Sequence, residues 1–177
     1  MTRFAALLAL CLAACASQPP ADNAIQPDAR AETQATTIPL VIHTARGAHR
    51  FDVEVARTPQ DQQKGLMFRK SLGPGTGMLF PMDPPRTASF WMKDTLIPLD
   101  MLFIRTDGTI AFIKANAEPY SRLPVSAGVP VAAVLELAGG RAAALGIGEG
   151  DSVAWGGCAA PQERRETDLN FCPPPPR

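Results

Sequence analysis

The segment that most limits what this chain can fold into is its N-terminus, because its pattern is that of a segment to be removed. Arg3 supplies a positive charge, residues 4–12 are apolar, and the small residues that follow lead directly to Cys15. These are the three parts of a cleavable export signal. The apolar run is too short to cross a bilayer as a helix, which needs about 20 apolar residues. We therefore expect residues 1–14 to lie outside the folded protein.

The cleavage region resembles the signal of bacterial lipoproteins, because Leu-Ala-Ala precedes Cys15 and a polar stretch follows at once. The resemblance implies lipidation of Cys15, cleavage before it and N-acylation, and more than one acyl chain gives stable membrane anchoring. Ala16 rather than Asp at the next position implies, in a Gram-negative host, the outer membrane and a periplasm-facing domain. The alternative is an ordinary secretory signal cut elsewhere, with Cys11 and Cys15 both discarded.

The mature chain is expected to have three parts. Residues 15–37 are rich in Ala, Pro, Gln and Thr without apolar periodicity, which predicts a flexible tether. Residues 38–157 number about 120, enough for one domain with a modest core. Residues 158–177 form a Cys- and Pro-rich tail whose end we expect to be extended.

The net charge of the mature chain argues against nucleic-acid binding. The sequence has 17 Lys and Arg and 17 Asp and Glu, and removal of residues 1–14 takes away Arg3, which leaves 16 − 17 = −1. Nucleic-acid binding needs a basic face, and this balance supplies none. The expected partners are instead a membrane, through the anchor, and a small molecule, a glycan or an envelope protein.

Two cysteines remain once Cys11 is removed and Cys15 is lipidated. They are Cys158 and Cys172, with 13 residues between them. In an oxidising compartment such a pair is expected to form a disulfide. Closing a loop of this length stabilises the folded chain by about 3 kcal/mol in the chain-entropy model. A metal or redox pair is the alternative, but no Cys-x-x-Cys and no nearby His supports it.

Residues 38–157 have the pattern of a mainly β domain with one or two short helices. The expected strands are residues 38–44, 49–56, 89–92, 100–105, 109–114, 131–137 and 152–155, with a short apolar segment at 78–80. Thr58 caps a helix with Pro59 at its first position, and Gly65 ends it after about two turns. Residues 81–86 are expected to form a loop and residues 141–145 a helical turn. The sum is a single, mainly β domain.

Several short motifs follow one another in the order found in a known protein family. The motifs are Gly65-Leu66-Met67-Phe68-Arg69, Gly77-Met78-Leu79-Phe80, Phe90-Trp91-Met92-Lys93-Asp94-Thr95 with its continuation to Ile104, Val134-Leu135-Glu136-Leu137, and Gly150-Asp151. From about Phe51 to Val153 the chain resembles the uncharacterised bacterial and archaeal family called domain of unknown function 192. The resemblance implies a compact β-sandwich-like or barrel-like fold in exported or lipid-anchored proteins, and no established activity. Asp94 departs from the family, which often has Asn there.

Charged and aromatic side chains gather within a part of the domain that otherwise builds core. The candidate ligand-binding residues are Arg69, Trp91, Lys93, Asp94, Thr95, Asp100 and Glu136. In the functional hypothesis, Trp91 is the stacking platform of a pocket in which the two basic residues donate hydrogen bonds and Asp100 and Glu136 accept them. In the structural alternative, Lys93 or Arg69 instead pairs with one of these two carboxylates to satisfy charges at the sheet end.

The methionines suggest a second binding hypothesis. All five of the mature chain fall within 35 residues; they are Met67, Met78, Met82, Met92 and Met101. Thioethers suit copper(I) in an oxidising compartment. The alternative is gap-filling in the core, since most of them sit beside Leu, Phe or Trp and neither His43 nor His49 is near in sequence. We expect no metal and no other cofactor.

The sequence contains no familiar catalytic motif: no Gly-x-Ser-x-Gly, no His-Glu-x-x-His, no Walker loop and no dinucleotide fingerprint. Asp100 and Glu136 would suit glycan hydrolysis only if their carboxyl groups were about 5 to 9.5 Å apart. The favoured hypothesis is therefore non-catalytic recognition of a small ligand, glycan or envelope partner through the face around Trp91 and Lys93. An envelope-glycan enzyme and a copper-binding protein are the alternatives.

Overall fold

The computed structural model describes residues 37–159 and 169–173. The predicted signal segment, Cys15, nearly all of the predicted tether and most of the predicted tail lie outside the described residues. Within those residues no helix has the length and apolar character needed to span a membrane.

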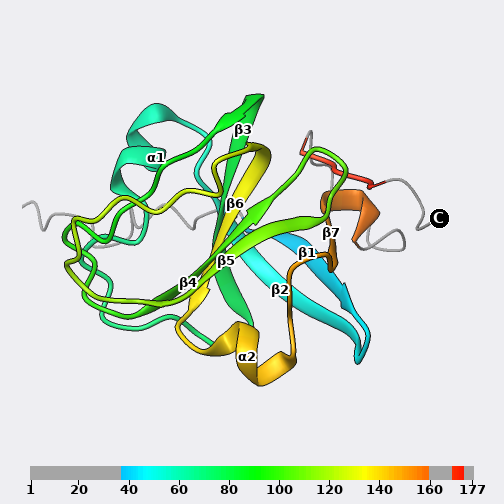
Figure 1. The fold of residues 1–177 in the computed structure, drawn as a ribbon, viewed down its shortest axis with the longest axis horizontal. Helices are drawn as coiled ribbons and strands as arrows, with labels where there is room; N and C mark the ends of the chain where they lie inside the picture. Colours follow the sequence, from blue (N-terminus) through cyan, green and yellow to red (C-terminus); the bar gives the residue numbers. More distant parts are fainter. Residues whose placement is uncertain (1–36, 160–168, 174–177) are drawn as a thin grey trace, which may run out of the picture. The chain divides into compact units, whose positions relative to one another are not determined.

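Seven strands form one sheet in the order β5-β4-β6-β3-β2-β1-β7 (Figure 1). The strands are β1 (Thr37–Thr44), β2 (Gly47–Val55), β3 (Thr76–Thr87), β4 (Leu99–Ile104), β5 (Ile110–Ala117), β6 (Pro130–Ala138) and β7 (Ser152–Trp155). Two short helices, α1 (Pro59–Lys64) and α2 (Arg141–Leu145), and the 3-10 turn η1 (Gly156–Cys158) complete the fold. The prediction of a single, mainly β domain is confirmed.

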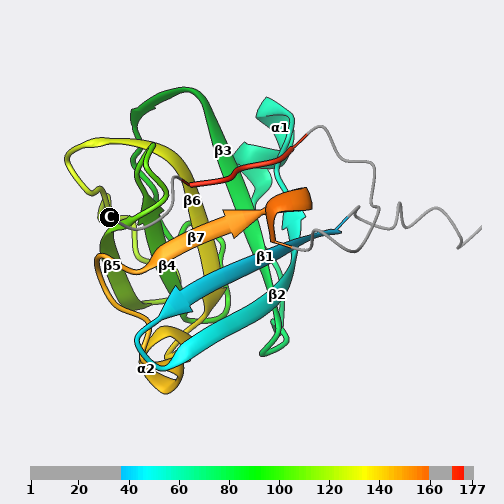
Figure 2. The ribbon, with the colours of Figure 1, turned by 90° about the vertical axis from the view of Figure 1, so that its right-hand side faces the viewer.

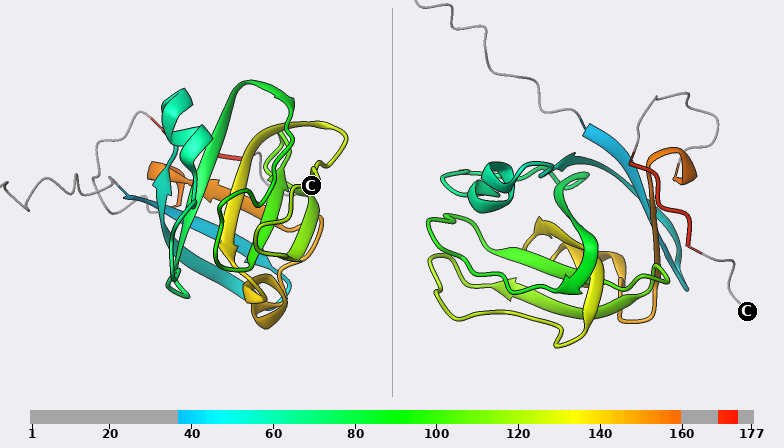
Figure 3. Two further views of the ribbon diagram at one scale, coloured as in Figure 1. Left: turned by 90° about the vertical axis from the view of Figure 1, so that its left-hand side faces the viewer. Right: turned by 90° about the horizontal axis from the view of Figure 1, so that it is seen from above.

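The sheet closes on itself because its two outermost strands meet. Ile110 at the start of β5 donates its backbone N–H to Asp151, and Val153 of β7 donates to Gly108, at 2.9 and 2.8 Å. Figure 3 shows the result from above, where β4, β5 and β6 curve round to the layer of β1, β2 and β7. A curved, nearly closed sheet has two faces that must both be filled or solvated, one inside and one outside.

Two apolar cores fill these faces. The inner core takes alternate residues from all seven strands, and its members include Leu40, Ile42, Phe51, Val53, Leu79, Leu102, Ile104, Ile110, Leu135, Leu137, Val153 and Trp155. The outer core lies on the other face of β3, β6 and β4, where the segments after α1 and before β4 cover it. Its members include Leu66, Met78, Phe80, Met82, Met92, Leu99, Met101, Phe103 and Val134. Consecutive residues of β3, β4 and β6 therefore face different cores.

Local sequence signals account for the short helix α1. The Thr58 hydroxyl accepts a hydrogen bond from the Asp61 N–H, and the Asp61 carboxylate accepts one from the Thr58 N–H, both at 3.1 Å. This is a capping box, and its hydrogen bonds to Thr58 lower the pKa of Asp61. Gly65 ends the helix at φ 47°, as predicted. The cap places Lys64 in the last turn, at the edge of the groove described below.

Two predicted boundaries are wrong. Residues 81–86, expected as a loop, belong to β3, which runs through them with a register shift against β6 between Pro81 and Arg86. Prolines are tolerated where a strand bulges away from its ladder. Residues 89–92, expected as a strand, make only the single bridge between Phe90 and Val125. Their apolar character serves the outer core, which takes Phe90 and Met92, while Trp91 between them faces solvent.

The predicted disulfide between Cys158 and Cys172 is confirmed, with 5.3 Å between the two Cα atoms. It holds the segment 169–173 against the end of β7, where Phe171 pairs with Trp155 through two backbone hydrogen bonds. The two rings stack with centroids 4.2 Å apart. Figure 2 shows this segment running alongside β7.

Candidate functional site

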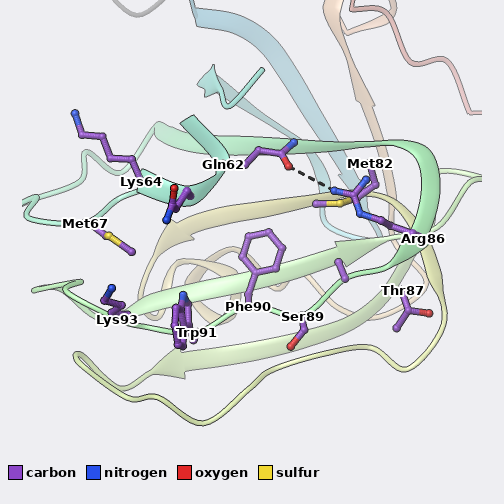
Figure 4. Close-up of a pocket in the computed structure, with 12 residues that line it drawn as sticks. Gln62, Lys64, Met67, Met82, Arg86, Thr87, Ser89, Phe90, Trp91 and Lys93 are labelled. Carbon is purple, nitrogen blue, oxygen red and sulfur yellow. Dashed lines mark hydrogen bonds between the residues drawn. The ribbon is translucent and has the colours of Figure 1, made fainter. Parts of the chain in front are cut away.

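A groove with a volume of about 470 Å³ opens between α1 and the segment that leads from β3 towards β4. Ligand pockets in proteins commonly have volumes of about 300 to 1,000 Å³. The groove is lined by Gln62, Gln63, Lys64, Met67, Met82, Arg86, Thr87, Ala88, Ser89, Phe90, Trp91 and Lys93. Figure 4 shows α1 and Met67 on one side and the run from Ser89 to Lys93 on the other. The ring of Phe90 points from this run into the space between the two sides.

The inner part of the groove is apolar and rigidly supported. Phe90 stands edge-on against Phe80 of the outer core, with ring centroids 5.0 Å apart, and a second edge-on contact of 6.1 Å joins it to Phe103. Met82 is buried beside them. A ligand in the groove would therefore rest on side chains already fixed by the outer core.

The charged side chains that line the groove are all basic. Lys64 comes from the last turn of α1, Arg86 from β3 and Lys93 from the following segment, while the lining contains no Asp or Glu. Arg86 also reaches across to Gln62 of α1, at 3.5 Å, as the dashed line in Figure 4 marks. Three cations around an apolar floor give the groove a positive potential, which favours an anionic ligand.

Trp91 and Lys93 are side by side at one end of the groove, as the sequence analysis expected, although they lie on a loop rather than a strand. The Lys93 ammonium is 5.7 Å from the centre of the Trp91 ring, within the range of a cation–π contact. Half of the Trp91 surface, 51%, is exposed. The nearest carboxylate to Lys93 is that of Asp94, at 4.0 Å, and the two side chains are 40% and 38% exposed.

Most of the other predicted site residues have local structural partners. Arg69 makes a two-bond ion pair with Glu54 of β2, and this hydrogen bonding raises the pKa of Arg69. Asp94 has φ 52° and accepts the Phe68 N–H with its backbone carbonyl. Thr95 is buried and donates its hydroxyl to the Lys93 carbonyl. Of the seven predicted residues, only Trp91 and Lys93 line the groove.

Asp100 is fully buried, and backbone groups occupy its carboxylate. One oxygen accepts the N–H groups of Asn116 and Gly140 at 2.8 and 2.9 Å, and the other accepts the Ala142 N–H at 2.8 Å. These donors come from the end of β5 and the start of α2. The carboxylate therefore ties three segments together at one end of the inner core.

Glu136 is also buried, with 4% of its surface exposed, but its surroundings are different. It lies on β6 between Met78 of β3 and Met101 of β4, on the outer-core face. In the described part of the chain its carboxylate has no hydrogen-bond or ion-pair partner. Burial alone raises the pKa of Glu136 to about 8, so that the carboxyl group is mainly protonated at pH 7.

These positions overturn two arrangements that the sequence analysis considered. Neither Lys93 nor Arg69 pairs with Asp100 or Glu136, because Asp94 and Glu54 are their acidic neighbours. The register places Asp100 opposite Leu137 of the inner core, whereas Glu136 faces the outer core. The two carboxyl groups thus lie on opposite faces of the sheet, where they cannot act together on one glycosidic bond.

Met67 and Met82 line the groove, and Met82 belongs to the outer core as well. Met78, Met82, Met92 and Met101 are all buried in the outer core among Phe and Leu side chains, as gap-filling residues are. Within the described ranges no group of three or more His, Cys, Asp or Glu side chains is placed to hold a metal ion. A copper(I) site made by thioethers stays a prediction.

Several lining residues were missed by the sequence analysis. Gln62 and Lys64 belong to α1, and Arg86 lies in the stretch expected to be a loop. Arg86 is more than twenty residues away from Gln62 and Lys64 in the sequence. The three side chains meet only because β3 folds under α1. The available signals were the capping box at Thr58 and the glycine at position 65, which fix where α1 starts and where it ends.

Comparison with known proteins places the chain in a family. The model of the family DUF192, described as "Uncharacterized ACR", matches residues 41–155. The chain belongs to this family. No curated protein matches the sequence.

Two solved structures are similar to this DUF192 protein. A protein of unknown function from Novosphingobium aromaticivorans is 43% identical, with a TM-score of 0.68, and the match covers 79% of this chain and 100% of that one. A Sinorhizobium meliloti protein described as a candidate transcription regulator is 41% identical, with a TM-score of 0.67, over 70% and 97% of the two chains. That description applies to the Sinorhizobium protein alone.

Proposed function

We propose that this DUF192 protein is a lipid-anchored protein of the cell envelope that binds a small amphipathic anion without catalysis. The observation that carries the proposal is the make-up of the groove, in which Lys64, Arg86 and Lys93 surround an apolar floor and no acidic side chain takes part. The apolar part of a ligand would lie on Phe90 and beside Trp91. Its anionic group would meet the cations at the rim.

The composition of the lining favours binding over catalysis. General acid–base chemistry near neutral pH relies mostly on His or on carboxylates with shifted pKa values. The lining residues include neither, nor a Cys, and Glu136 with its raised pKa is not among them. The second hollow, about 360 Å³ around Phe112 and Val125, carries both Lys114 and Glu118 and so lacks the single sign of charge.

The lipid anchor and the envelope location are supported by the sequence through Cys15 and the pattern of residues 1–14. The disulfide between Cys158 and Cys172 is consistent with an oxidising compartment. A neutral glycan is a less good match to the groove, because neutral sugars do not require three cations around one apolar floor.

Two dyes that share a skeleton test the groove. The fluorescent anion 8-anilinonaphthalene-1-sulfonate is an amphipathic anion, and N-phenyl-1-naphthylamine is its uncharged analogue. We expect the anion to bind the mature-length chain more tightly than the neutral dye. Lys93→Gln and Arg86→Gln should each weaken anion binding about tenfold, because each removes one charge-assisted contact, and leave the neutral dye unaffected.

The matched control is Arg46→Gln, since Arg46 is an exposed cation in the β1–β2 turn. That turn lies on the other side of the domain from α1, which borders the groove (Figure 1). It should leave the affinity for both dyes unchanged. Equal affinities for the two dyes, or equal losses in the control and the groove variants, would contradict the proposal.

A further inference from the structure

Five large apolar side chains are exposed in the described part of the chain, and all five lie on three neighbouring loops. They are Phe68, Trp91, Tyr120, Leu123 and Val129, with exposed fractions of 64, 51, 60, 76 and 38%. We call residues 65–72, 90–98 and 118–129 the aromatic loops. They lie at the opposite side of the domain from the β1–β2 turn, as Figures 1 and 3 both show. Single exposed apolar residues are ordinary, whereas a gathering on one side marks an interaction surface.

Backbone hydrogen bonds join the three loops into one surface. Phe68 donates its N–H to the Asp94 carbonyl at 2.8 Å, and Tyr120 donates to Thr95 at 3.2 Å. Met92 donates to the carbonyl of Ser121 at 2.8 Å. The middle loop is thus bonded to both of its neighbours, so that the exposed side chains are presented together.

The backbone holds these side chains outwards at a cost in stability. Phe68 and Tyr120 have φ values of 64° and 62°, and Asp94 between them has 52°. Left-handed conformations are unfavourable for most residues other than Gly, Asn and Asp, so the strain falls on Phe68 and Tyr120, because bulky aromatic residues adopt them seldom. Strain of this kind is often found where a segment has a function. Two exposed aromatic residues in strained conformations gain little from folding, which indicates a contact outside the chain.

The aromatic loops are basic within an acidic chain. They contain Arg69, Lys70, Lys93 and Arg122 against Asp94 and Glu118, a balance of 4 − 2 = +2. The mature chain as a whole has 16 − 17 = −1, so the rest of it carries −1 − 2 = −3. Glu54 of β2 is the ion-pair partner of Arg69. With this residue counted, the loops carry 4 − 3 = +1, a charge still opposite in sign to that of the mature chain.

We infer that the aromatic loops dock onto the surface of an anionic lipid bilayer, with Phe68, Trp91 and Tyr120 at the level of the lipid headgroups. Trp and Tyr combine an apolar ring with a polar atom and are favoured at membrane interfaces. Basic side chains near the surface add attraction to anionic lipids. Trp91 also lines the groove, so docking brings the groove rim to the bilayer.

Because the proposed lipid anchor already holds the domain near the membrane, a weak contact between the aromatic loops and the bilayer is sufficient for docking. Between Cys15 and Thr37 the chain advances 22 residues, which fully extended span at most about 75 Å. An anchored domain therefore stays within this distance of the bilayer, at a high effective concentration. The aromatic loops need only orient a domain that is already held nearby.

Tryptophan fluorescence provides a direct test, because the chain has two Trp residues in opposite environments. Trp91 is half exposed, while Trp155 is 4% exposed and stacked on Phe171. The mature-length chain with Cys15→Ser cannot be acylated, so its binding to vesicles reports the loops alone. With vesicles of equal parts phosphatidylcholine and phosphatidylglycerol, we expect a blue shift of the Trp91 emission and its quenching by brominated lipids. Pure phosphatidylcholine vesicles should give a much smaller response.

The double variant Phe68→Asn, Tyr120→Asn removes the aromatic rings but suits the backbone, since Asn tolerates positive φ. We expect it to fold normally and to bind the anionic vesicles at least tenfold more weakly, because two apolar side chains no longer enter the interface. Arg122→Gln should weaken binding less, and Arg46→Gln at the far turn should not. The anionic dye should still bind the double variant, because neither residue lines the groove, which keeps this test separate from that of the proposed function.

Three results would overturn the inference. The first is an emission spectrum that no vesicle changes. The second is equal binding to neutral and anionic vesicles, which would remove the role of charge. The third is undiminished vesicle binding by the double variant, which would place the contact elsewhere on the chain.

Discussion

Asp100 and Glu136 are buried carboxylates on neighbouring strands of one sheet, yet they stand in opposite situations. Asp100 faces the inner core and accepts three backbone N–H groups. Glu136 faces the outer core, has methionines on both adjacent strands, and has no partner among the described residues. The first carboxylate closes the end of the fold. The buried Glu136 carboxyl group, in contrast, lowers the stability of the folded chain at neutral pH.

The same contrast holds for the regions around them. Asp100 lies at the end of the domain where α2 begins and where its carboxylate joins the chain segments. Glu136 lies in the outer core, below the cover that forms the basic groove and the aromatic loops. Proteins depart from locally favourable choices mainly where function requires it. The outer side, with its uncompensated carboxyl group and strained aromatic residues, is therefore where we place the function.

The largest effect at neutral pH is expected from Asp100→Ala, because one buried and two part-buried N–H groups would lose their acceptor. An unsatisfied buried donor costs about 1 to 3 kcal/mol and a part-buried donor less, so the free energy of unfolding should fall by about 3 kcal/mol. Urea unfolding monitored by circular dichroism measures this. Asp100→Asn keeps one acceptor oxygen and should lose less. A neutral result for Asp100→Ala would remove the structural role assigned to this residue.

Glu136→Gln should have the opposite sign and depend on pH. Below about pH 4.5 the carboxyl group is protonated in both folded and unfolded chains. Between about 4.5 and 8 the unfolded chain ionises and the folded one does not, so the free energy of unfolding of the wild type falls as the pH rises. The free energy of unfolding of Glu136→Gln should not fall in this way, because a glutamine side chain does not ionise.

The free energy of unfolding of Glu136→Gln should therefore exceed that of the wild type by an amount that grows with pH. The growth should be on the order of 1 kcal/mol per pH unit across this window and should level off above the folded-state pKa of Glu136. Chemical unfolding of both proteins at several pH values provides the measurement. A difference that stays constant with pH would show that the Glu136 carboxyl group is not desolvated in the folded protein.

The smallest effect concerns the strained aromatic residues. Phe68→Asn and Tyr120→Asn should each raise the free energy of unfolding, by about 1 kcal/mol at most, because Asn is less strained at positive φ. Thermal unfolding of the single variants tests this. Phe68→Ala retains the strain and is the matched control, which should show no gain. Destabilisation by the Asn variants would mean that the rings are held by contacts within the fold.

Local patterns in the sequence predicted most of the fold. The alternation of apolar and polar residues located β1 and β2, and Asp107-Gly108 located the turn before β5. Thr58 and Gly65 fixed the ends of α1 because capping acts over a few residues. The strand predicted at residues 89–92 was wrong. An apolar run of this length fits both a paired strand and a loop that packs over a core, and periodicity does not distinguish the two.

The site was predicted only in part because its geometry depends on register and distant pairing. Trp91 and Lys93 are close in sequence, and their shared position was foreseen. Arg69 meets Glu54 through the fold of the segment around α1, fifteen residues away. The partners of Asp100 are backbone N–H groups, which leave no trace in residue types. A shift of one residue in the register of β6 would have exchanged the faces of its side chains.

The central claim, that the groove side of this protein binds an amphipathic anion, is tested most directly by native mass spectrometry of the mature chain isolated from its own envelope. The wild type would be compared with the double variant Arg86→Gln, Lys93→Gln. We expect the wild type to carry an added mass that fragments to an anion with an apolar part, and the folded variant to lack it. The mass of the bare chain in both proteins, or the same added mass in both, would contradict the claim.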